Sequence, residues 1–265
     1  MLKTLCLRKG GMASLLLLAF IFFTRPIHSS EKKSAPTVRE ITLCSIDWPP
    51  YYGQNLVKGG FITEIIRRSL KHSSLVLKTQ YLPWQRTVNF AKQGKVCSGI
   101  YTFGSKTEER KKFFHFSEPL PSLKFSVIVR KNSEIIVKNL NDLKKLRIGI
   151  VSGYTLTKEF EAVRKTLTLT EVTEDLQLIK MLISNRVNAI LTDPRVFQHY
   201  GKLHFPKDLL NYGDVFLIQE NSQYVGISKA AKQSQAITEA LNKGIRHLNS
   251  NGDIQKIMDS PDFSH

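Results

Sequence analysis

The sequence predicts an α/β protein of two lobes, each lobe built on a doubly wound sheet. Short apolar runs alternate with amphipathic helical patterns, as in parallel sheets whose strands are joined by helices. The alternation begins near residue 41 and starts again near residue 147, which indicates two units. Two extended segments, 124–131 and 222–229, can join these units. Two crossings form a hinge, and a ligand cleft is expected between the lobes.

The first unit contains three expected strands and two expected helices. The segment 61–72 is amphipathic, because its apolar residues recur at helical spacing on one side. The second helix begins at Pro83 and ends at Gly94, and these residue types favour helix starts and helix ends respectively. The expected strands are 41–46, 75–82 and 96–103.

The second unit repeats the pattern, and the chain then returns to the first. The expected strands are 147–151, 167–172, 187–192 and 214–219, and the expected helices are 156–163, 174–185 and 194–201. The last two helical segments, 234–249 and 252–259, have no strands of their own, so we expect them to cover the first lobe. We therefore assign residues 31–126 and 227–265 to lobe 1 and residues 127–226 to lobe 2.

Residues 1–30 have the order of a secretory signal peptide. A basic start precedes an apolar run at 12–23 and the polar stretch "TRPIHSS". The run is short for a membrane span, so we expect export to the periplasm with cleavage near Ser30, and a retained anchor is the alternative. Cleavage would remove four basic residues and no acidic residue, which lowers the formal charge from +17 to +13.

Composition argues against several classes of function. The Lys and Arg residues are scattered and are not interleaved with stacking aromatics, which argues against nucleic-acid binding. The histidines are also scattered and no Cys/His cluster has zinc spacing, so we expect neither a metal nor another cofactor. Cys44 and Cys97 leave two outcomes open, namely a disulfide in an exported protein or two buried free thiols.

The loop "TFGSKTEER", residues 102–110, follows an expected strand and leads into a helix. Ligands of open α/β sheets bind beyond such strand ends. Thr107 is a suitable N-cap, which places Arg110 at the third helical position. Helical side chains lean towards the helix N-terminus, so Arg110 can reach the cleft. The alternative is a solvated Arg110 paired with Glu118.

The segment "SKTEERKKFFHFSEPL" resembles the T-x-x-R and F-S-x-P signature of the bacterial extracellular solute-binding proteins of family 3, the periplasmic receptors of polar amino acid ABC transporters. The early "DWPPYY", the "LNDLKKLRIGIVSGYT" that opens the second unit and the later "LISNRVNAILTD" are similar to family patterns in the same order. The resemblance implies a two-lobed periplasmic-binding-protein-like fold. It also implies an amino acid-like ligand, an inner-membrane ABC permease as partner, and a monomer.

The resemblance also implies roles for individual residues. Arg110 matches the arginine that binds a ligand α-carboxylate through two parallel donors, and Ser105 matches a further contact to that carboxylate. Thr155 matches a donor from the second lobe, at a helix N-terminus. Asp193 matches the carboxylate that receives the ligand ammonium. Such a site would recognise an α-amino acid by its two charges.

Aromatic side chains are expected to form the walls of the site. Trp48 and Trp84 match family positions that pack on the ligand, with ordinary core packing as the alternative. Tyr52 and Tyr101, with Tyr51, are further candidates at the rim. Phe103 departs from the small hydroxyl residue that is common at its position, which bears on the class of ligand.

Two other functions are compatible with this pattern. A sensory subunit could use the same cleft to signal to a membrane receptor. A cyclohexadienyl or arogenate dehydratase-like enzyme could also use the same fold. We assign no catalytic residue, because Asp193 is the only evident acid or base in the expected cleft and no nucleophile and base pair is present.

Overall fold

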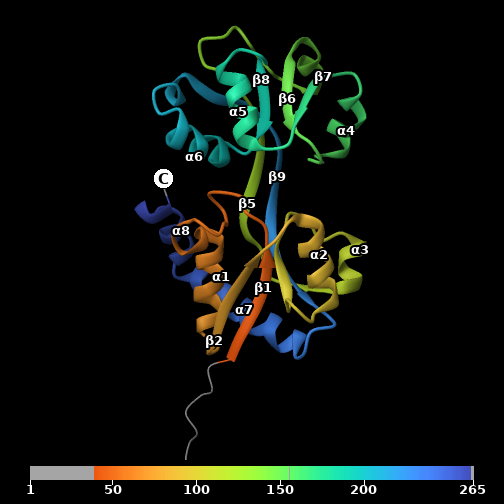
Figure 1. The fold of residues 1–265 in the computed structure, drawn as a ribbon, viewed down its shortest axis with the longest axis vertical. Coiled ribbons are helices and arrows are strands. Elements are labelled where there is room, and N and C mark those ends of the chain that lie inside the picture. Colours follow the sequence, from red (N-terminus) through yellow and green to blue (C-terminus); the bar gives the residue numbers. More distant parts are fainter. Residues whose placement is uncertain (1–38, 155, 264–265) are drawn as a thin grey trace, which may run out of the picture. The chain divides into compact units, whose positions relative to one another are not determined.

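The computed structural model describes residues 39–154 and 156–263, which belong to one compact unit. The predicted signal peptide and Thr155 lie outside the described residues. The order of strands and helices agrees with the predicted alternation, and the described strands form a nine-stranded mixed sheet (Figure 1). Along this sheet the order is β2-β1-β3-β9-β5-β8-β6-β7, and β4 pairs with β9.

The first lobe combines the early part of the chain with its last helices. Strand β1 pairs in parallel with β2 and β3. Helix α7 packs against α1, as the sequence predicts, and their apolar faces share one core cluster. The strands are β1 (Arg39–Ser45), β2 (Leu75–Tyr81), β3 (Gly99–Phe103) and β4 (Phe114–Phe116), and the helices are α1 (Phe61–Lys71), α2 (Trp84–Gln93), α3 (Glu108–Phe113), α7 (Ser234–Ser250) and α8 (Asp253–Met258).

The second lobe has the same parallel arrangement at its centre. Strand β6 pairs in parallel with β7 and β8, and the chain has two further core clusters here. The strands are β6 (Arg147–Val151), β7 (Thr168–Val172) and β8 (Ala189–Thr192), and the helices are α4 (Lys158–Arg164), α5 (Asp175–Ile183) and α6 (Pro194–His204). Short 3-10 turns lie at η1 (Val57–Gly59), η2 (Leu140–Lys145), η3 (Leu209–Asn211) and η4 (Pro261–Phe263).

Two long antiparallel strands connect the lobes. They are β5 (Leu120–Arg130) and β9 (Tyr212–Ser228), which pair with each other and with strands of the lobes (Figure 1). The predicted extended crossings, 124–131 and 222–229, lie in these strands except for the last residue of each. The expected strand at 214–219 is not separate, because β9 continues through it to Ser228. The register of β5 and β9 shifts at three places, where regular pairing is interrupted.

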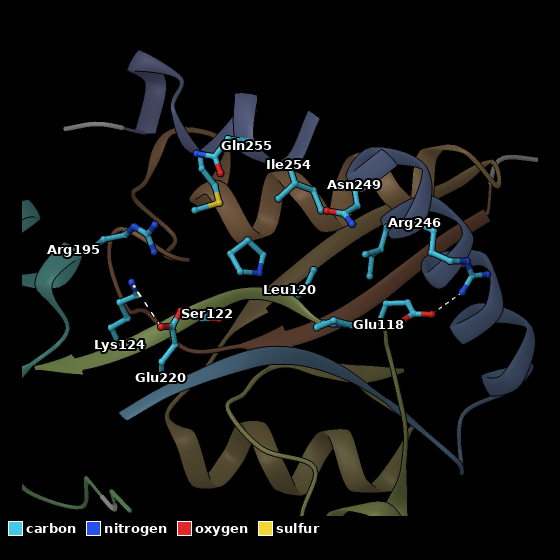
Figure 2. Close-up of a pocket in the computed structure, with 14 residues that line it drawn as sticks. Glu118, Leu120, Ser122, Lys124, Arg195, Glu220, Arg246, Asn249, Ile254 and Gln255 are labelled. Carbon is cyan, nitrogen blue, oxygen red and sulfur yellow. Dashed lines mark hydrogen bonds and ion pairs between the residues drawn. The ribbon is translucent and has the colours of Figure 1, made fainter. Parts of the chain in front are cut away.

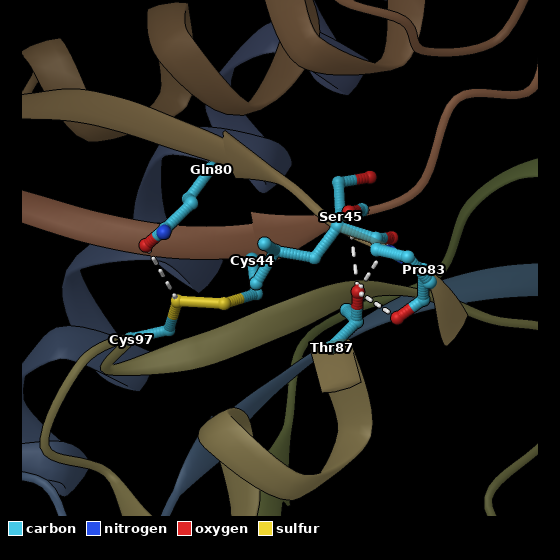
Figure 3. The surroundings of a disulfide bond; sticks show 7 residues. Cys44, Ser45, Gln80, Pro83, Thr87 and Cys97 are labelled. Carbon is cyan, nitrogen blue, oxygen red and sulfur yellow. Dashed lines mark hydrogen bonds between the residues drawn. A yellow bond between two sulfur atoms is a disulfide. The ribbon is translucent and has the colours of Figure 1, made fainter. Parts of the chain in front are cut away.

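A disulfide joins Cys44 of β1 to Cys97, two residues before β3. The Cα atoms are 5.6 Å apart, and both residues are fully buried (Figure 3). The structure therefore selects the paired outcome that the sequence left open. Next to the disulfide, the Thr87 hydroxyl lies 2.9 Å from the Leu82 carbonyl oxygen and 3.3 Å from that of Ser45, which attaches the start of α2 to the end of β1.

Within the described part of the chain, no helix combines the length and the apolar character that a membrane span requires. The same residues contain no group of three or more His, Cys, Asp or Glu side chains arranged to hold a metal ion.

Candidate functional site

The Arg110 side chain turns back towards the end of β3, as the sequence predicts. Thr107 caps α3 by accepting a hydrogen bond from the Arg110 backbone N–H at 3.3 Å. Arg110 Nη1 then donates to the Ser105 hydroxyl at 3.0 Å and to the Ser105 carbonyl at 3.1 Å. The alternative pairing of Arg110 with Glu118 is not formed among the described residues, where the Glu118 carboxylate instead accepts from Arg246 at 2.8 Å.

The guanidinium lies on an aromatic platform. Arg110 Cζ is 4.5 Å from the ring centroid of Phe103, the last residue of β3. Partial burial lowers the pKa of the Arg110 guanidinium, and the nearby Glu109 opposes this shift. Its Nε and Nη2 groups have no hydrogen-bond partner among the described residues. These two donors are available for a planar anion such as a carboxylate.

The four predicted aromatic positions separate into two environments. Trp84 is 37% exposed and meets the Phe103 ring edge to face at 6.2 Å, beside the Arg110 platform. Tyr52 and Tyr101 are buried in the core of the first lobe. The Tyr101 hydroxyl donates to Thr79 at 3.0 Å and lies 3.1 Å from the Thr63 hydroxyl, so its polar end is satisfied internally. Trp48 lies elsewhere, at the boundary between the lobes.

Trp48 reaches the second lobe through its indole nitrogen. Its Nε1 donates to Asp175 Oδ2 at 3.1 Å, and the Tyr154 hydroxyl donates to the same oxygen at 2.9 Å. Sequence reasoning missed Asp175 and Tyr154, because an acidic residue at a helix start is ordinary. Burial raises the pKa of Tyr154, and so does the Asp175 charge, so this phenol remains a donor.

Asp193 is fully enclosed at the start of α6. Its Oδ1 caps the helix by accepting from the backbone N–H groups of Arg195 and Val196. Its Oδ2 accepts from the Tyr51 hydroxyl at 2.7 Å and from the Lys124 N–H at 2.8 Å. Burial raises the pKa of Asp193, whereas these hydrogen bonds oppose the shift. The carboxylate therefore connects both lobes and the β5 crossing in this structure.

A cavity of about 460 Å³ lies where β5, α6, α7 and α8 meet, and none of the predicted ligand-binding residues line it. Figure 2 shows that Glu118 pairs with Arg246 and that Lys124 pairs with Glu220 beside this cavity. These charges neutralise each other. Arg110, in contrast, forms no ion pair with another residue that the structure describes, and for this reason we place the candidate site at Arg110 and the lobe boundary.

The model of the bacterial extracellular solute-binding proteins, family 3, matches residues 42–260. The chain belongs to this family. No curated protein matches the sequence. Family membership agrees with the fold.

Solved structures of amino acid-binding proteins share the fold. The second substrate-binding domain of Lactococcus lactis GlnP, in its open conformation, has a TM-score of 0.65 at 21% identity, covering 85% of this chain and 96% of that one. A substrate-binding protein of an amino acid ABC transporter from Streptococcus pneumoniae, bound to L-arginine, has a TM-score of 0.64 at 22% identity, with 84% and 94% covered.

A sensor domain is similarly close in structure. A histidine kinase sensor domain with similarity to periplasmic binding proteins has a TM-score of 0.64 at 16% identity, and the match covers 83% of this chain and 94% of that one. Identities this low establish the shared fold for this solute-binding protein and leave its ligand open.

Proposed function

We propose that this solute-binding protein captures a small amino acid, or a related polar solute, in the cleft between its lobes and delivers it to an inner-membrane ABC permease. The observation that supports the proposal most directly is Arg110. Its guanidinium is held by Ser105 on the face of Phe103, while two donors have no partner among the described residues. A preorganised fork of this kind suits a carboxylate, because little side-chain entropy remains to be lost on binding.

The proposal includes the arrangement of the chain around that cleft. Lobe 1 comprises residues 31–126 and 227–265, and lobe 2 comprises residues 127–226. Ser105, Arg110 and Trp84 contribute from lobe 1, where their contacts are described above, and Trp48 contributes at the boundary. Thr155 follows Tyr154 in the chain and is proposed as a donor from lobe 2. The protein acts in the periplasm, as a monomer, after removal of residues 1–30.

Isothermal titration calorimetry against the twenty L-amino acids tests this function. At least one should bind, and Arg110→Ala should weaken that binding by about 100-fold, because a charged hydrogen-bonded contact in a partly desolvated site is lost. Lys112→Ala is the matched control, since it removes an exposed cation from the same helix. Equal affinity in the Arg110 variant would refute the carboxylate role.

A sensory role is the second candidate, and the similarity to a histidine kinase sensor domain favours it. The ligand site would be the same, so binding data do not separate the two roles. Uptake of labelled amino acid by cells that lack the protein separates them, because only a transport receptor restores uptake when it is supplied. Purified protein should leave prephenate and arogenate unchanged in either case, and turnover of these acids would favour the dehydratase-like alternative.

A further inference from the structure

Asp175 is a buried carboxylate that has no cationic partner in the described part of the chain. Its side chain lies at the start of α5, where the residue is 7% exposed. Three neutral groups donate to it: the Thr192 hydroxyl at 2.7 Å, the Tyr154 hydroxyl at 2.9 Å and the Trp48 indole at 3.1 Å. No Lys, Arg or His among the described residues forms an ion pair with it. Burial of such a charge is costly unless a cation compensates it.

The donors come from two lobes. Thr192 and Tyr154 belong to the same lobe as Asp175, whereas Trp48 follows β1 in the other lobe. Separation of the lobes would therefore break only the Trp48 contact and uncover one face of the carboxylate. A carboxylate has about four acceptor positions, so three donors also leave one position open.

The two aromatic donors to Asp175, Trp48 and Tyr154, belong to a cluster of aromatic rings. Trp48 stacks on Tyr51 with centroids 5.0 Å apart, and Phe125 lies 6.5 Å from Trp48 and 5.1 Å from Tyr154. Faces of aromatic rings attract ammonium and guanidinium groups. A cation bound by Asp175 would therefore lie near aromatic rings as well as the carboxylate.

Asp193 has no comparable open acceptor position for a ligand cation. Four donors already occupy its two oxygens, at distances from 2.7 to 3.3 Å, and the residue is 1% exposed. Its acceptor positions are therefore filled by the helix cap, by Tyr51 and by β5. A ligand ammonium could bind there only if these native contacts were broken.

We propose that Asp175, and not Asp193, receives the cationic group of the ligand, and that the Trp48 indole occupies this acceptor when no ligand is bound. The inference rests on the proposed function and specifies its ligand chemistry, a solute with a carboxylate for Arg110 and an α-ammonium for Asp175. The ligand would then join the lobes through two charges in place of one neutral hydrogen bond.

The test compares three proteins, the wild type, Asp175→Asn and Asp193→Asn, by calorimetry. The probes are the twenty L-amino acids, the 2-hydroxy acid counterparts of those that bind, and agmatine, which is a cation without a carboxylate. Asp175→Asn should weaken amino acid binding by about 30-fold or more and leave the 2-hydroxy acids within about twofold, because only the former carry an α-ammonium. Asp193→Asn should lower the melting temperature without changing this preference.

A second variant keeps the test valid if Asp175→Asn fails to fold. Trp48→Phe retains an aromatic ring and removes the Nε1–H that occupies Asp175. It should increase the preference for the amino acid over its 2-hydroxy counterpart by at least twofold. A preference unchanged by Trp48→Phe and by Asp175→Asn, or one abolished by Asp193→Asn, would overturn the inference and leave the proposed function intact.

The remaining outcomes separate the two proposals. Binding of agmatine but of no amino acid would refute an amino acid ligand and the carboxylate role of Arg110, and the loss of agmatine binding in Asp175→Asn would then support the role of Asp175. Retention of agmatine binding in that variant would refute both proposals. Binding of none of these probes by the wild type would also refute both.

Discussion

Arg110 shows how a residue that opposes a local rule can indicate a site. Helix starts favour anions, and Glu108 and Glu109 follow that preference in the first turn of α3. Arg110 departs from it, but its guanidinium leans back to Ser105 and rests on Phe103 instead of lying beside its own helix start. Contacts with Ser105 and Phe103 therefore compensate for this unfavourable position, and they hold the guanidinium in the orientation that the proposed carboxylate contact requires.

Ser105 is expected to act on ligand affinity through Arg110. Replacement of Ser105 by Ala removes the hydroxyl acceptor of Nη1 and leaves the backbone carbonyl, so the guanidinium is held less firmly. Affinity for a bound amino acid should fall by about fivefold, the equivalent of one ordinary hydrogen bond. Calorimetry measures this change, and Ser105→Thr, which keeps a hydroxyl, is the control. An unchanged affinity in Ser105→Ala would show that Ser105 does not position Arg110.

At the scale of elements, the sequence predicted what depends on local pattern. The order of strands and helices, the cap at Thr107 and the return of the last helices to α1 all follow from periodicity and from helix-boundary residues. Strand β4 was missed, because three residues are too few for a pattern. The continuous β9 was missed because the polar residues Asn221 and Ser222 interrupt its alternation where it pairs with β5.

Contacts between residues far apart in the sequence could also not be predicted from local sequence patterns. Cys44 and Cys97 are 53 residues apart, and they meet because β1 and β3 are neighbours in the sheet. Asp175 and Trp48 come from different lobes, so no spacing in the sequence relates them. The orientation of Arg110 could be predicted from the sequence, because its partners Ser105 and Phe103 lie within seven residues of it.

The disulfide between β1 and the segment before β3 should contribute strongly to stability. Closing a loop of this length removes conformational entropy from the unfolded chain, worth about 4 kcal/mol in the chain-entropy model. The Cys44→Ser, Cys97→Ser double variant should therefore unfold at a lower urea midpoint than the oxidised wild type. Its ligand affinity should not change, because neither cysteine touches Arg110 or Asp175. Wild type treated with a reductant is the control, and equal midpoints for oxidised and reduced wild type would contradict the expectation.

At the scale of the whole molecule, two hydrogen bonds to buried carboxylates join the lobes beside the crossing strands. They are the Trp48 contact with Asp175 and the Tyr51 contact with Asp193. A ligand shifts a conformational equilibrium only through contacts that differ between its states. The proposed ligand contacts of Arg110 in one lobe and Asp175 in the other would supply such a difference, whereas the Tyr51 contact with Asp193 is present without ligand.

Tyr51→Phe should therefore loosen the ligand-free protein more than the liganded one. Burial of the Tyr51 hydroxyl, together with the facing Asp193 charge, raises its pKa, so the phenol is a donor at all ordinary pH values and its removal costs one hydrogen bond. We expect a larger radius of gyration without ligand, by small-angle X-ray scattering, and a similar radius at saturation. The apparent dissociation constant should rise by about fivefold, because the closed state is less populated before binding.

Tyr81→Phe is the matched control, since the Tyr81 hydroxyl donates to Gly59 within the first lobe. If both variants gave the wild-type radius and affinity, the Tyr51 contact would have no part in closure, and the equilibrium between the lobes would depend on β5, β9 and the ligand contacts.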